Sequence, residues 1–254
     1  MISKDETIKI NEEGWNNLIK SNRPFANTAL PEYGPFLKKN ENDLNLLGDT
    51  QDKIVLDLGS GSGDTIKYLK EIKKTKEIWG IDISKEQINK TIKKFPELEK
   101  NLIISPMEKD INIRNYFDIV VSIFSIGYTS DLESTFKNVS NYLKKEGIFI
   151  VSWTHPFYYC LELDEDNKII VSKSYFNDSV EMITKGTDKI QLAQTNVMIS
   201  TMINAAKNAG LYLDKMLEEE TIMLDTVNGY KSTFWKKEKT EKCPSTIIYV
   251  FKKI

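Results

Sequence analysis

Three glycines in a short turn are the first residues of this sequence whose type and spacing suggest chemistry. Gly59, Gly61 and Gly63 occupy alternate positions just after the apolar run Ile54–Leu56. Glycine lets the backbone turn sharply and approach a ligand closely, so a glycine-rich turn after a buried strand is common in nucleotide sites. The spacing here is G-x-G-x-G, whereas the dinucleotide fingerprint is G-x-G-x-x-G. The turn therefore predicts a ligand site, without specifying a dinucleotide.

Two aspartates narrow the kind of ligand. Asp57 lies within the strand, two residues before the first glycine, where a carboxylate would repel a pyrophosphate but form a charge-assisted contact with an ammonium group. Asp82 directly follows the apolar run Ile78–Ile81. That position lies beside the ribose in Rossmann-type sites, where a carboxylate accepts from both hydroxyls. The pair favours a cofactor with a ribose and an ammonium group; the alternative is that both acids merely cap helices or turns.

These residues resemble motifs I and II of the class I S-adenosylmethionine-dependent methyltransferases. The resemblance is carried by VLDLGSGSGD at Val55–Asp64 and by GIDIS at Gly80–Ser84. It is strong over roughly residues 50–155 and continues through the C-terminal part of the chain. It implies an enzyme that uses S-adenosyl-L-methionine as its cofactor. It also implies a seven-stranded sheet in which the last of two C-terminal strands is antiparallel.

The elements that would position these residues follow from hydrophobic periodicity. Short apolar runs alternate with helical patterns, and such runs are typical of parallel strands buried between helices. Five strands are predicted at 54–56, 78–81, 102–104, 119–121 and 148–151, with two more at 211–213 and 246–251. Helices are predicted at 65–72, 84–94, 132–143 and 196–208. The pattern predicts a doubly wound, Rossmann-like α/β sheet that is mostly parallel.

We expect four segments along this sheet domain. Residues 1–50 form an N-terminal helical lid, and residues 51–155 form the S-adenosylmethionine-binding core. Residues 156–193 form a cap inserted after strand five, and residues 194–254 form the C-terminal part of the same domain. The lid contains one helix around Trp15. The cap is rich in aromatic residues, and its turn sequence Asp164–Asn167 predicts a hairpin.

The resemblance also implies cofactor contacts at positions that match the family's motifs. Asp57 and the backbone at Gly59 and Gly61 would face the methionine moiety. Asp82 would hold the ribose, and Ile83 would pack on the adenine.

Three further stretches complete the implied cofactor site. The family usually has Gly-Asp-Ala after strand three, where this chain has Ser-Pro-Met-Glu, so the Met107 backbone and Glu108 are the expected substitutes. The residues that end strand four, Ser122, Ile123 and Phe124, would lie under the sulfonium. Many relatives close an N-terminal tyrosine over the methionine carboxylate. Tyr33 is the candidate here, and simple packing is the alternative.

Two residues are candidates for catalysis. His155, the one histidine of the chain, follows strand five at the sheet edge where ligands of open α/β sheets bind. A neutral imidazole there can take a proton from the acceptor, unless the histidine only fixes the turn into the cap. Tyr128, in the loop after strand four, is the second candidate, with packing again the alternative. In-line placement can supply much of the catalysis, so a strong base is not required.

Composition limits the partners and the location. The 254 residues are 40% hydrophobic and 28% charged, with 35 Lys+Arg against 37 Asp+Glu. A net charge of −2 gives no general attraction to nucleic acids or anionic membranes. We expect no transmembrane helix and no signal peptide, and we expect the two cysteines to be free thiols in a cytoplasmic protein. No cluster of histidines and carboxylates predicts a metal site.

The expected acceptor is a small metabolite, methylated on an O, N or S atom by a monomer or homodimer. Relatives that methylate base amines usually carry Asp/Asn-Pro-Pro-aromatic at the end of strand four, where this chain has Ser122–Ser125. One alternative is a non-catalytic S-adenosylmethionine-binding protein. The other is a nicotinamide-dependent oxidoreductase, which Asp57 and the glycine spacing disfavour. The sequence does not name the acceptor.

Overall fold

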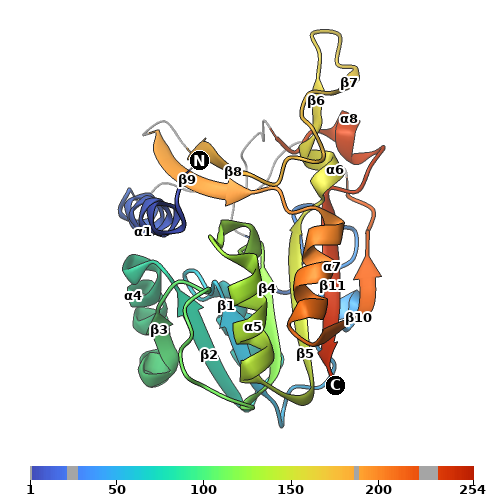
Figure 1. Cartoon of the computed structure of the whole chain (residues 1–254). Coiled ribbons are helices and arrows are strands. Elements are labelled where there is room, and N and C mark those ends of the chain that lie inside the picture. Colours follow the sequence, from blue (N-terminus) through green and yellow to red (C-terminus); the bar gives the residue numbers. More distant parts are fainter. Residues whose placement is uncertain (1, 22–27, 186–188, 223–233) are drawn as a thin grey trace.

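The computed structural model describes residues 2–21, 28–185, 189–222 and 234–254, and its centre is a seven-stranded sheet with helices on both faces (Figure 1). The strand order is β10-β11-β5-β4-β1-β2-β3. These strands are β1 (Ile54–Leu58), β2 (Glu77–Asp82), β3 (Leu102–Ile104), β4 (Phe117–Ile123), β5 (Leu143–Thr154), β10 (Leu211–Leu217) and β11 (Thr246–Lys253).

The direction of the strands confirms the predicted fold class. Strands β1 to β5 run parallel, and β11 runs antiparallel to both of its neighbours, β5 and β10. The strand order reverses at β1, which lies between β2 and β4. In open α/β sheets, ligands bind outside the carboxyl ends of the strands at such a switch point. The topology therefore directs attention to the ends of β1, β2 and β4.

Helices cover both faces of the sheet and its ligand-binding end. The longer ones are α1 (Lys4–Lys20), α3 (Asp64–Glu71), α4 (Lys85–Lys94), α5 (Leu132–Tyr142) and α7 (Ile199–Asn208). The shorter ones are α2 (Glu41–Leu44), η1 (Pro96–Asn101), η2 (Ile126–Tyr128), α6 (Pro156–Tyr159) and α8 (Lys237–Thr240). In Figure 1, α5 and α7 lie in front of the sheet, and α1 lies beyond the carboxyl ends of its strands.

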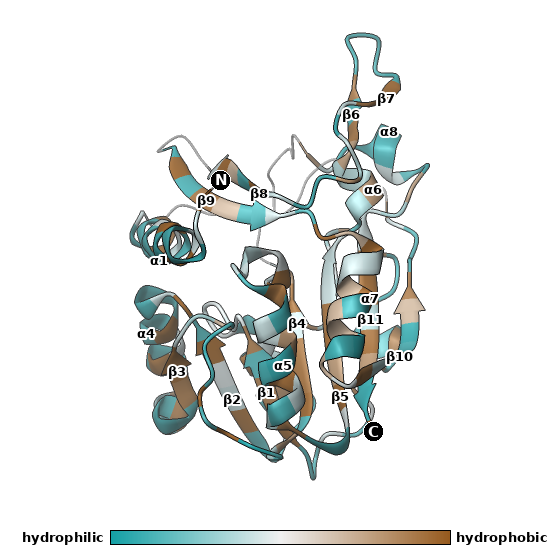
Figure 2. Cartoon of the chain, viewed as in Figure 1, coloured by the Kyte–Doolittle hydropathy of each residue, from teal (hydrophilic) through white to brown (hydrophobic). Residues whose placement is uncertain are grey.

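Two hydrophobic cores lie on the two sides of the sheet, because successive side chains of a strand point to opposite faces. Leu56 belongs to the core that includes Phe136 of α5 and Met202 of α7. Its neighbour Val55 belongs to the other core, with Ile66 of α3 and Ile88 of α4. Figure 2 shows the central strands as largely hydrophobic. Both faces of the parallel strands are therefore buried, as the apolar runs predicted.

Helix α4 begins at a serine cap. Ser84 is the N-cap, and its hydroxyl accepts from the backbone N–H of Gln87 at 3.2 Å, which is one half of a capping box. The reciprocal bond from the side chain of Gln87 is missing, because that side chain bonds to the hydroxyl of Ser62 in the glycine turn. The second half of the capping box is replaced by a contact between α4 and the turn.

The region after β5 forms two hairpins. Strands β6 (Leu161–Leu163) and β7 (Ile169–Val171) pair antiparallel across the turn that the sequence analysis identified. A second pair, β8 (Val180–Lys185) and β9 (Ile190–Thr195), packs against α1. Figure 1 shows β9 beside α1, although Ile190 lies 170 positions after Lys20 along the chain. Two segments that are remote in sequence thus meet above the sheet.

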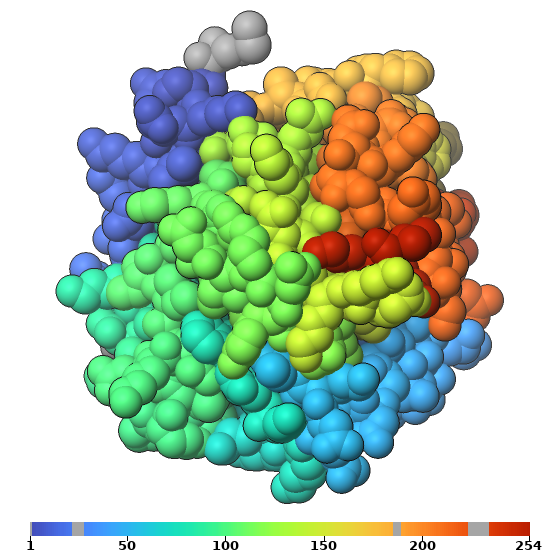
Figure 3. Space-filling model, turned by 60° about the horizontal axis from the view of Figure 1, so that its bottom comes forward, coloured from blue at the N-terminus to red at the C-terminus, as the bar shows by residue number. Residues whose placement is uncertain are grey.

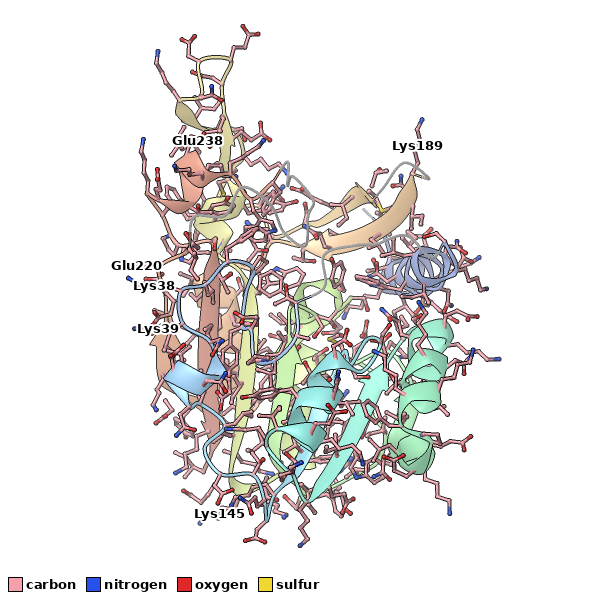
Figure 4. The ribbon with its side chains drawn as sticks, turned by 180° about the vertical axis from the view of Figure 1, so that it is seen from behind. Lys38, Lys39, Lys145, Lys189, Glu220 and Glu238 are labelled. Carbon is pink, nitrogen blue, oxygen red and sulfur yellow. The ribbon has the colours of Figure 1, made fainter. Side chains whose placement is uncertain are left out.

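Two further contacts hold the edges of the fold. Residues 36–39 pair with residues 219–222, and Lys38 and Glu220, which form an ion pair of 3.0 Å, lie together in Figure 4. At the opposite end, the ammonium of Lys253 donates to the carbonyl oxygens of Ser140 and Leu143 at 2.7 and 2.8 Å. Figure 3 shows the C-terminal strand in red beside the yellow-green residues that follow α5. Within the described residues, no helix is both long enough and apolar enough to cross a bilayer.

A substitution in α1 tests how closely this helix packs on β9. Gly→Ala in a helix normally stabilises a protein by about 0.5–1 kcal/mol. At Gly14, however, a Cβ atom would lie 2.3 Å from the carbonyl oxygen of Gln191. We expect Gly14→Ala to lower the melting temperature by several degrees, since the helix and β9 must separate. Glu12→Ala, at an exposed position of the same helix, is the control and should change stability by less than about 0.5 kcal/mol. A stabilised Gly14→Ala protein would contradict this packing.

Candidate active site

A cavity lies at the carboxyl ends of β1, β2 and β4, under α1. The space between its walls, including the part open to solvent, is about 830 Å³. Ten of the residues predicted for the site line it: Asp57, Gly59, Gly61, Asp82, Ile83, Met107, Glu108, Ile123, Phe124 and Tyr128. Three predicted residues, Tyr33, Ser122 and His155, do not line it. The structure thus brings together most of the predicted site, and the role of each residue in it stays a prediction.

The glycine turn is held against the end of β2. The backbone N–H groups of Gly59 and Ser60 donate to the carbonyl oxygen of Ile81 at 2.8 and 2.9 Å. Gly59 has a φ of +83°, and a Cβ there would lie 2.3 Å from that of Ser125. At Gly61, also with a positive φ, the nearest atom to an added Cβ is 3.8 Å away. Gly59 therefore allows close packing within the protein, whereas the backbone at Gly61 borders open space in the cavity.

Asp82 connects the turn to the start of α4. Its Oδ2 accepts from the N–H of Gly61, and its Oδ1 accepts from the N–H of Ser84, both at 2.8 Å. Burial raises the pKa of the Asp82 carboxyl to about 6, although the two backbone donors act to lower it. Each carboxylate oxygen can accept a second hydrogen bond. The side chain is thus rigidly oriented and still able to accept from the hydroxyls of a ligand.

Asp57 is the most unusual side chain in the cavity. The residue is 2% exposed, and its Oδ2 has no hydrogen-bond partner within the described part of the chain. Burial raises the pKa of its carboxyl well above the usual range, and the charges of Asp82 and Asp64 raise it further. A buried acceptor without a partner is unfavourable and calls for an explanation. A cationic ligand group that donates to Asp57 would supply the missing partner, as the cofactor's ammonium group was expected to do.

His155 is not among the residues that line the cavity, and the catalytic role of its imidazole stays a prediction. Its Nδ1 accepts from the backbone N–H of Phe157 at 3.2 Å and caps α6. Its Nε2 lies 2.8 Å from Oε1 of Glu218. Because Nδ1 accepts, Nε2 carries the proton and donates to Glu218, so both nitrogens are engaged. Burial lowers the pKa of this imidazole, against the opposing effect of Glu218. The structural alternative is the one that the contacts favour.

Tyr33 and Ser122 also lie outside the cavity. Tyr33 is fully buried in the core that includes Val55, and its hydroxyl donates to the carboxylate of Glu41 at 2.7 Å. The packing alternative therefore holds for it, because Glu41 binds its polar end in the interior. The hydroxyl of Ser122 is 2.6 Å from that of Ser125, which in turn donates to the carbonyl of Leu58. Ser122 thus supports the floor of the cavity from beneath.

Phe124 and Tyr128 form an aromatic side of the cavity. Phe124 has a φ of +50°, a conformation that is strained for a bulky side chain. Its backbone N–H donates to the carbonyl of Ser152 at 3.1 Å. Tyr128 packs between Trp15 and Trp153, edge to face with each, at centroid distances of 5.2 Å. Backbone strain of this kind is concentrated at functional sites.

The segment after β3 is tied to the segment before α5. Oε1 of Glu108 accepts from the N–H of Ser130 at 2.9 Å and also from its hydroxyl. The carbonyl of Met107 accepts from the amide of Asn138 at 3.3 Å. These contacts fix Met107 and Glu108 at the rim of the cavity, beside Ile83.

The predicted helix around Trp15 forms the roof of the cavity, but sequence reasoning did not identify which of its residues line it. Ile8, Asn11 and Trp15 line it from α1, at a helical spacing of three and four residues. Asn11 is buried: its amide donates to the carbonyls of Ala193 and Tyr128, both at 2.9 Å, and its Oδ1 accepts from the N–H of Ala193 at 2.8 Å. The spacing of these three residues indicates that one face of the helix points inward, but the neighbouring sequence does not indicate what that face covers.

Known proteins resemble this chain in its core and in its fold. Residues 56–149 match the methyltransferase domain family. A protein of Invertebrate iridescent virus 6 that is described as a candidate methyltransferase is 28% identical over 104 residues, a match that spans 41% of this chain and 38% of the viral protein.

Two solved structures share the whole architecture. A candidate S-adenosylmethionine-dependent methyltransferase from Listeria monocytogenes is 19% identical with a TM-score of 0.64, covering 95% of this chain and 99% of that one. The geranyl diphosphate C-methyltransferase from Streptomyces coelicolor, solved with Mg²⁺, geranyl diphosphate and S-adenosyl-L-homocysteine, is 12% identical with a TM-score of 0.61 and covers 98% of both chains. At these identities the likeness is one of fold.

Substitution of Asp57 tests whether its carboxylate is a source of instability. Because its pKa is raised on folding, Asp57 favours the folded protein below the unfolded-state pKa of about 4. That contribution is lost as the pH rises through the folded-state value. We expect Asp57→Asn to be more stable than wild type at pH 8, by about 1 kcal/mol or about 2–4 °C, with a smaller advantage at pH 5.

Thermal unfolding between pH 5 and pH 8 measures this difference. Asp118→Asn is the matched control, because Asp118 on β4 accepts from the ammonium of Lys144 and its pKa is lowered. That variant should be less stable than wild type at pH 8. An Asp57→Asn protein that is destabilised at pH 8 would contradict the partnerless state of the carboxylate.

Proposed function

We propose that this chain is a class I S-adenosylmethionine-dependent methyltransferase and that it transfers a methyl group to an O, N or S atom of a small metabolite. The observation that carries the proposal is the buried Asp57 carboxylate, whose Oδ2 lacks a partner among the described residues, in the same cavity as Asp82 and the glycine turn. This donor and acceptor set fits a cofactor with an ammonium group at one end and a ribose near its middle.

In this proposal the chain's own residues bind and orient the cofactor. Asp57 accepts from the ammonium group, Asp82 accepts from the ribose hydroxyls, and Ile83 packs beside the adenine. Residues 1–50 act as a lid, and Trp15 on α1 helps to exclude water from the cavity. Glu108 and the Met107 backbone complete the adenine end.

The chemistry supplied by S-adenosyl-L-methionine is an electrophilic methyl group on a positively charged sulfur. The acceptor's lone pair forms the new bond to carbon, the electron pair of the broken C–S bond stays on sulfur, and a proton leaves the acceptor. The protein contributes in-line placement, for which Ile123 and Phe124 at the end of β4 are positioned. With His155 engaged by Glu218, Tyr128 is the candidate that remains in the cavity for contact with the acceptor.

The cellular location, the partner and the oligomeric state of the protein are also part of the proposal. We propose a cytoplasmic location, in agreement with the free thiols of Cys160 and Cys243. The proposed partner is the small-molecule acceptor, with no nucleic acid, and the active species is a monomer or homodimer.

Calorimetric titration with S-adenosyl-L-homocysteine tests the cofactor site. We expect micromolar binding to the wild type and a loss of at least about tenfold in Asp82→Ala, because charge-assisted hydrogen bonds contribute about 1.5–3 kcal/mol. Asp118→Asn, at the other end of β4, should bind as the wild type does. Binding of NAD in place of S-adenosyl-L-homocysteine would favour an oxidoreductase. Binding without methyl transfer to any acceptor in a metabolite screen would favour a non-catalytic protein.

The pH dependence of that binding follows from the raised pKa of Asp82. Only the carboxylate can accept from both hydroxyls, and with a pKa of about 6 it is about nine-tenths protonated at pH 5. We expect binding of S-adenosyl-L-homocysteine to be at least about tenfold weaker at pH 5 than at pH 7. Protonation of Asp57 acts in the same direction. Asp82→Asn should bind more weakly at pH 7 and change less over this interval; an affinity that is constant from pH 7 to pH 5 would argue against the assigned role.

A further inference from the structure

The cavity has one wall that the cofactor contacts do not fully account for. Phe124 and Tyr128 line it, and Trp153 stands behind both, with ring centroids 5.7 Å from Phe124 and 5.2 Å from Tyr128. Trp235, from the segment before α8, lies against Phe124 at 6.1 Å. These four residues are called the aromatic wall below. They come from three separate stretches of the chain, so their meeting is a product of the fold.

Phe124 lines the cavity from a strained backbone conformation. A φ of +50° is unfavourable for a phenylalanine, yet the hydrogen bond from its N–H to the Ser152 carbonyl holds it there. The cost of such strain is about 1–3 kcal/mol, and strain of this kind clusters at binding and catalytic sites. Because Phe124 follows directly on β4, the strained residue stands at the strand end where the reacting groups were expected to meet.

The charge around the cavity is negative. Among the described residues that line it, four are acidic, namely Asp57, Asp64, Asp82 and Glu108, and none is a lysine, arginine or histidine. Asp64 is paired with Lys94 at 2.8 Å, but that lysine does not line the cavity. An acceptor with a negative charge would meet these acids without a described cation beside them, in a poorly solvated space, whereas a neutral or cationic acceptor would not be repelled.

The chain itself places a cation on the continuation of this wall. Tyr158 stacks on Trp235 at 5.3 Å with an interplanar angle of 26°. The ammonium of Lys239, a residue only 3% exposed, lies 4.0 Å from the centroid of the Tyr158 ring and 4.8 Å from that of Phe234. Ring faces attract cations, and the attraction increases when water is excluded. A buried ammonium, that of Lys239, thus already lies against the aromatic rings that continue the wall.

We propose that the methyl acceptor is a planar aromatic or heteroaromatic molecule without a negative charge, bound against the aromatic wall. This inference rests on the proposed methyl transfer and names the class of its acceptor. The ring of the acceptor packs on Phe124 and Tyr128, which brings the heteroatom to be methylated to the end of β4. Carboxylated and phosphorylated metabolites are poor acceptors for this protein, because the cavity offers them carboxylates and no described cation.

Binding of four probes to the protein saturated with S-adenosyl-L-homocysteine tests this class. Indole, tryptamine and indole-3-acetate share one ring and differ in charge, whereas cyclohexylamine is a cation without a planar ring. We expect indole and tryptamine to bind at least tenfold more tightly than indole-3-acetate and cyclohexylamine. Indole-3-acetate binding as tightly as tryptamine, tight binding of cyclohexylamine, or absence of binding by indole and tryptamine would each overturn the proposal.

Matched variants locate the binding at the wall. Phe124→Leu keeps an apolar side chain but removes the ring, and it should weaken indole and tryptamine at least tenfold. Phe124→Tyr keeps the ring and should restore binding to within a few-fold of wild type. Phe176→Leu, the same change at an exposed phenylalanine that does not line the cavity, is the control and should leave the probes' affinity unchanged. An equal loss in Phe176→Leu and Phe124→Leu would overturn the assignment to the wall.

The affinity for S-adenosyl-L-homocysteine is measured first in every variant. A failure of the proposed function can then be distinguished from a failure of the acceptor class. Wild-type protein that binds neither this ligand nor the probes would reject the proposed function and the acceptor class with it. Protein that binds the ligand but shows the wrong order among the probes would reject the acceptor class alone.

Discussion

The structure of the site depends on hydrogen bonds between the turn after β1 and the end of β2. The N–H groups of Gly59 and Ser60 donate to the Ile81 carbonyl, and the N–H of Gly61 donates to the Asp82 carboxylate. Three successive backbone donors of the turn are thereby used within the protein. None of these three N–H groups donates to Oδ2 of Asp57, which lies next to the turn and lines the cavity. One set of backbone contacts therefore both orders Asp82 and leaves Asp57 in need of a ligand.

The cavity combines this acidic floor with an aromatic side, and the two features favour ligands of the same charge. Burial and then the charges of neighbouring acids raise the pKa of Asp57, and its carboxylate opposes the folded state unless a positive group joins it. Aromatic faces attract cations without adding charge of their own. A strained Phe124 and a partnerless Asp57 are both unfavourable for the isolated chain, as is common where a fold keeps groups ready for binding.

The parts of the fold and of the site that could be predicted from the sequence are those that depend on local patterns. The parts that depend on contacts between residues distant in sequence could not be predicted. The sheet, the glycine turn and Asp82 were predicted because strand periodicity and a strand-to-helix turn are local patterns. His155 and Tyr33 do not line the cavity because their positions are decided by Glu218 and Glu41, and a sequence shows no sign that a carboxylate will meet a given side chain. The aromatic wall was equally hidden, since Trp235 reaches Phe124 only through the assembled sheet.

The pairing of Asn11 with the backbone of Ala193 has a consequence for the order in which the molecule assembles. The two residues are 182 positions apart, whereas the turn, Asp57 and Asp82 lie within 26 residues of one another. Contacts of long sequence separation close large loops and form late. During synthesis, α1 is made first but must wait for β9 before Asn11 finds its partners. The floor of the cavity is therefore built from neighbouring segments, whereas its roof depends on a segment that is synthesised much later.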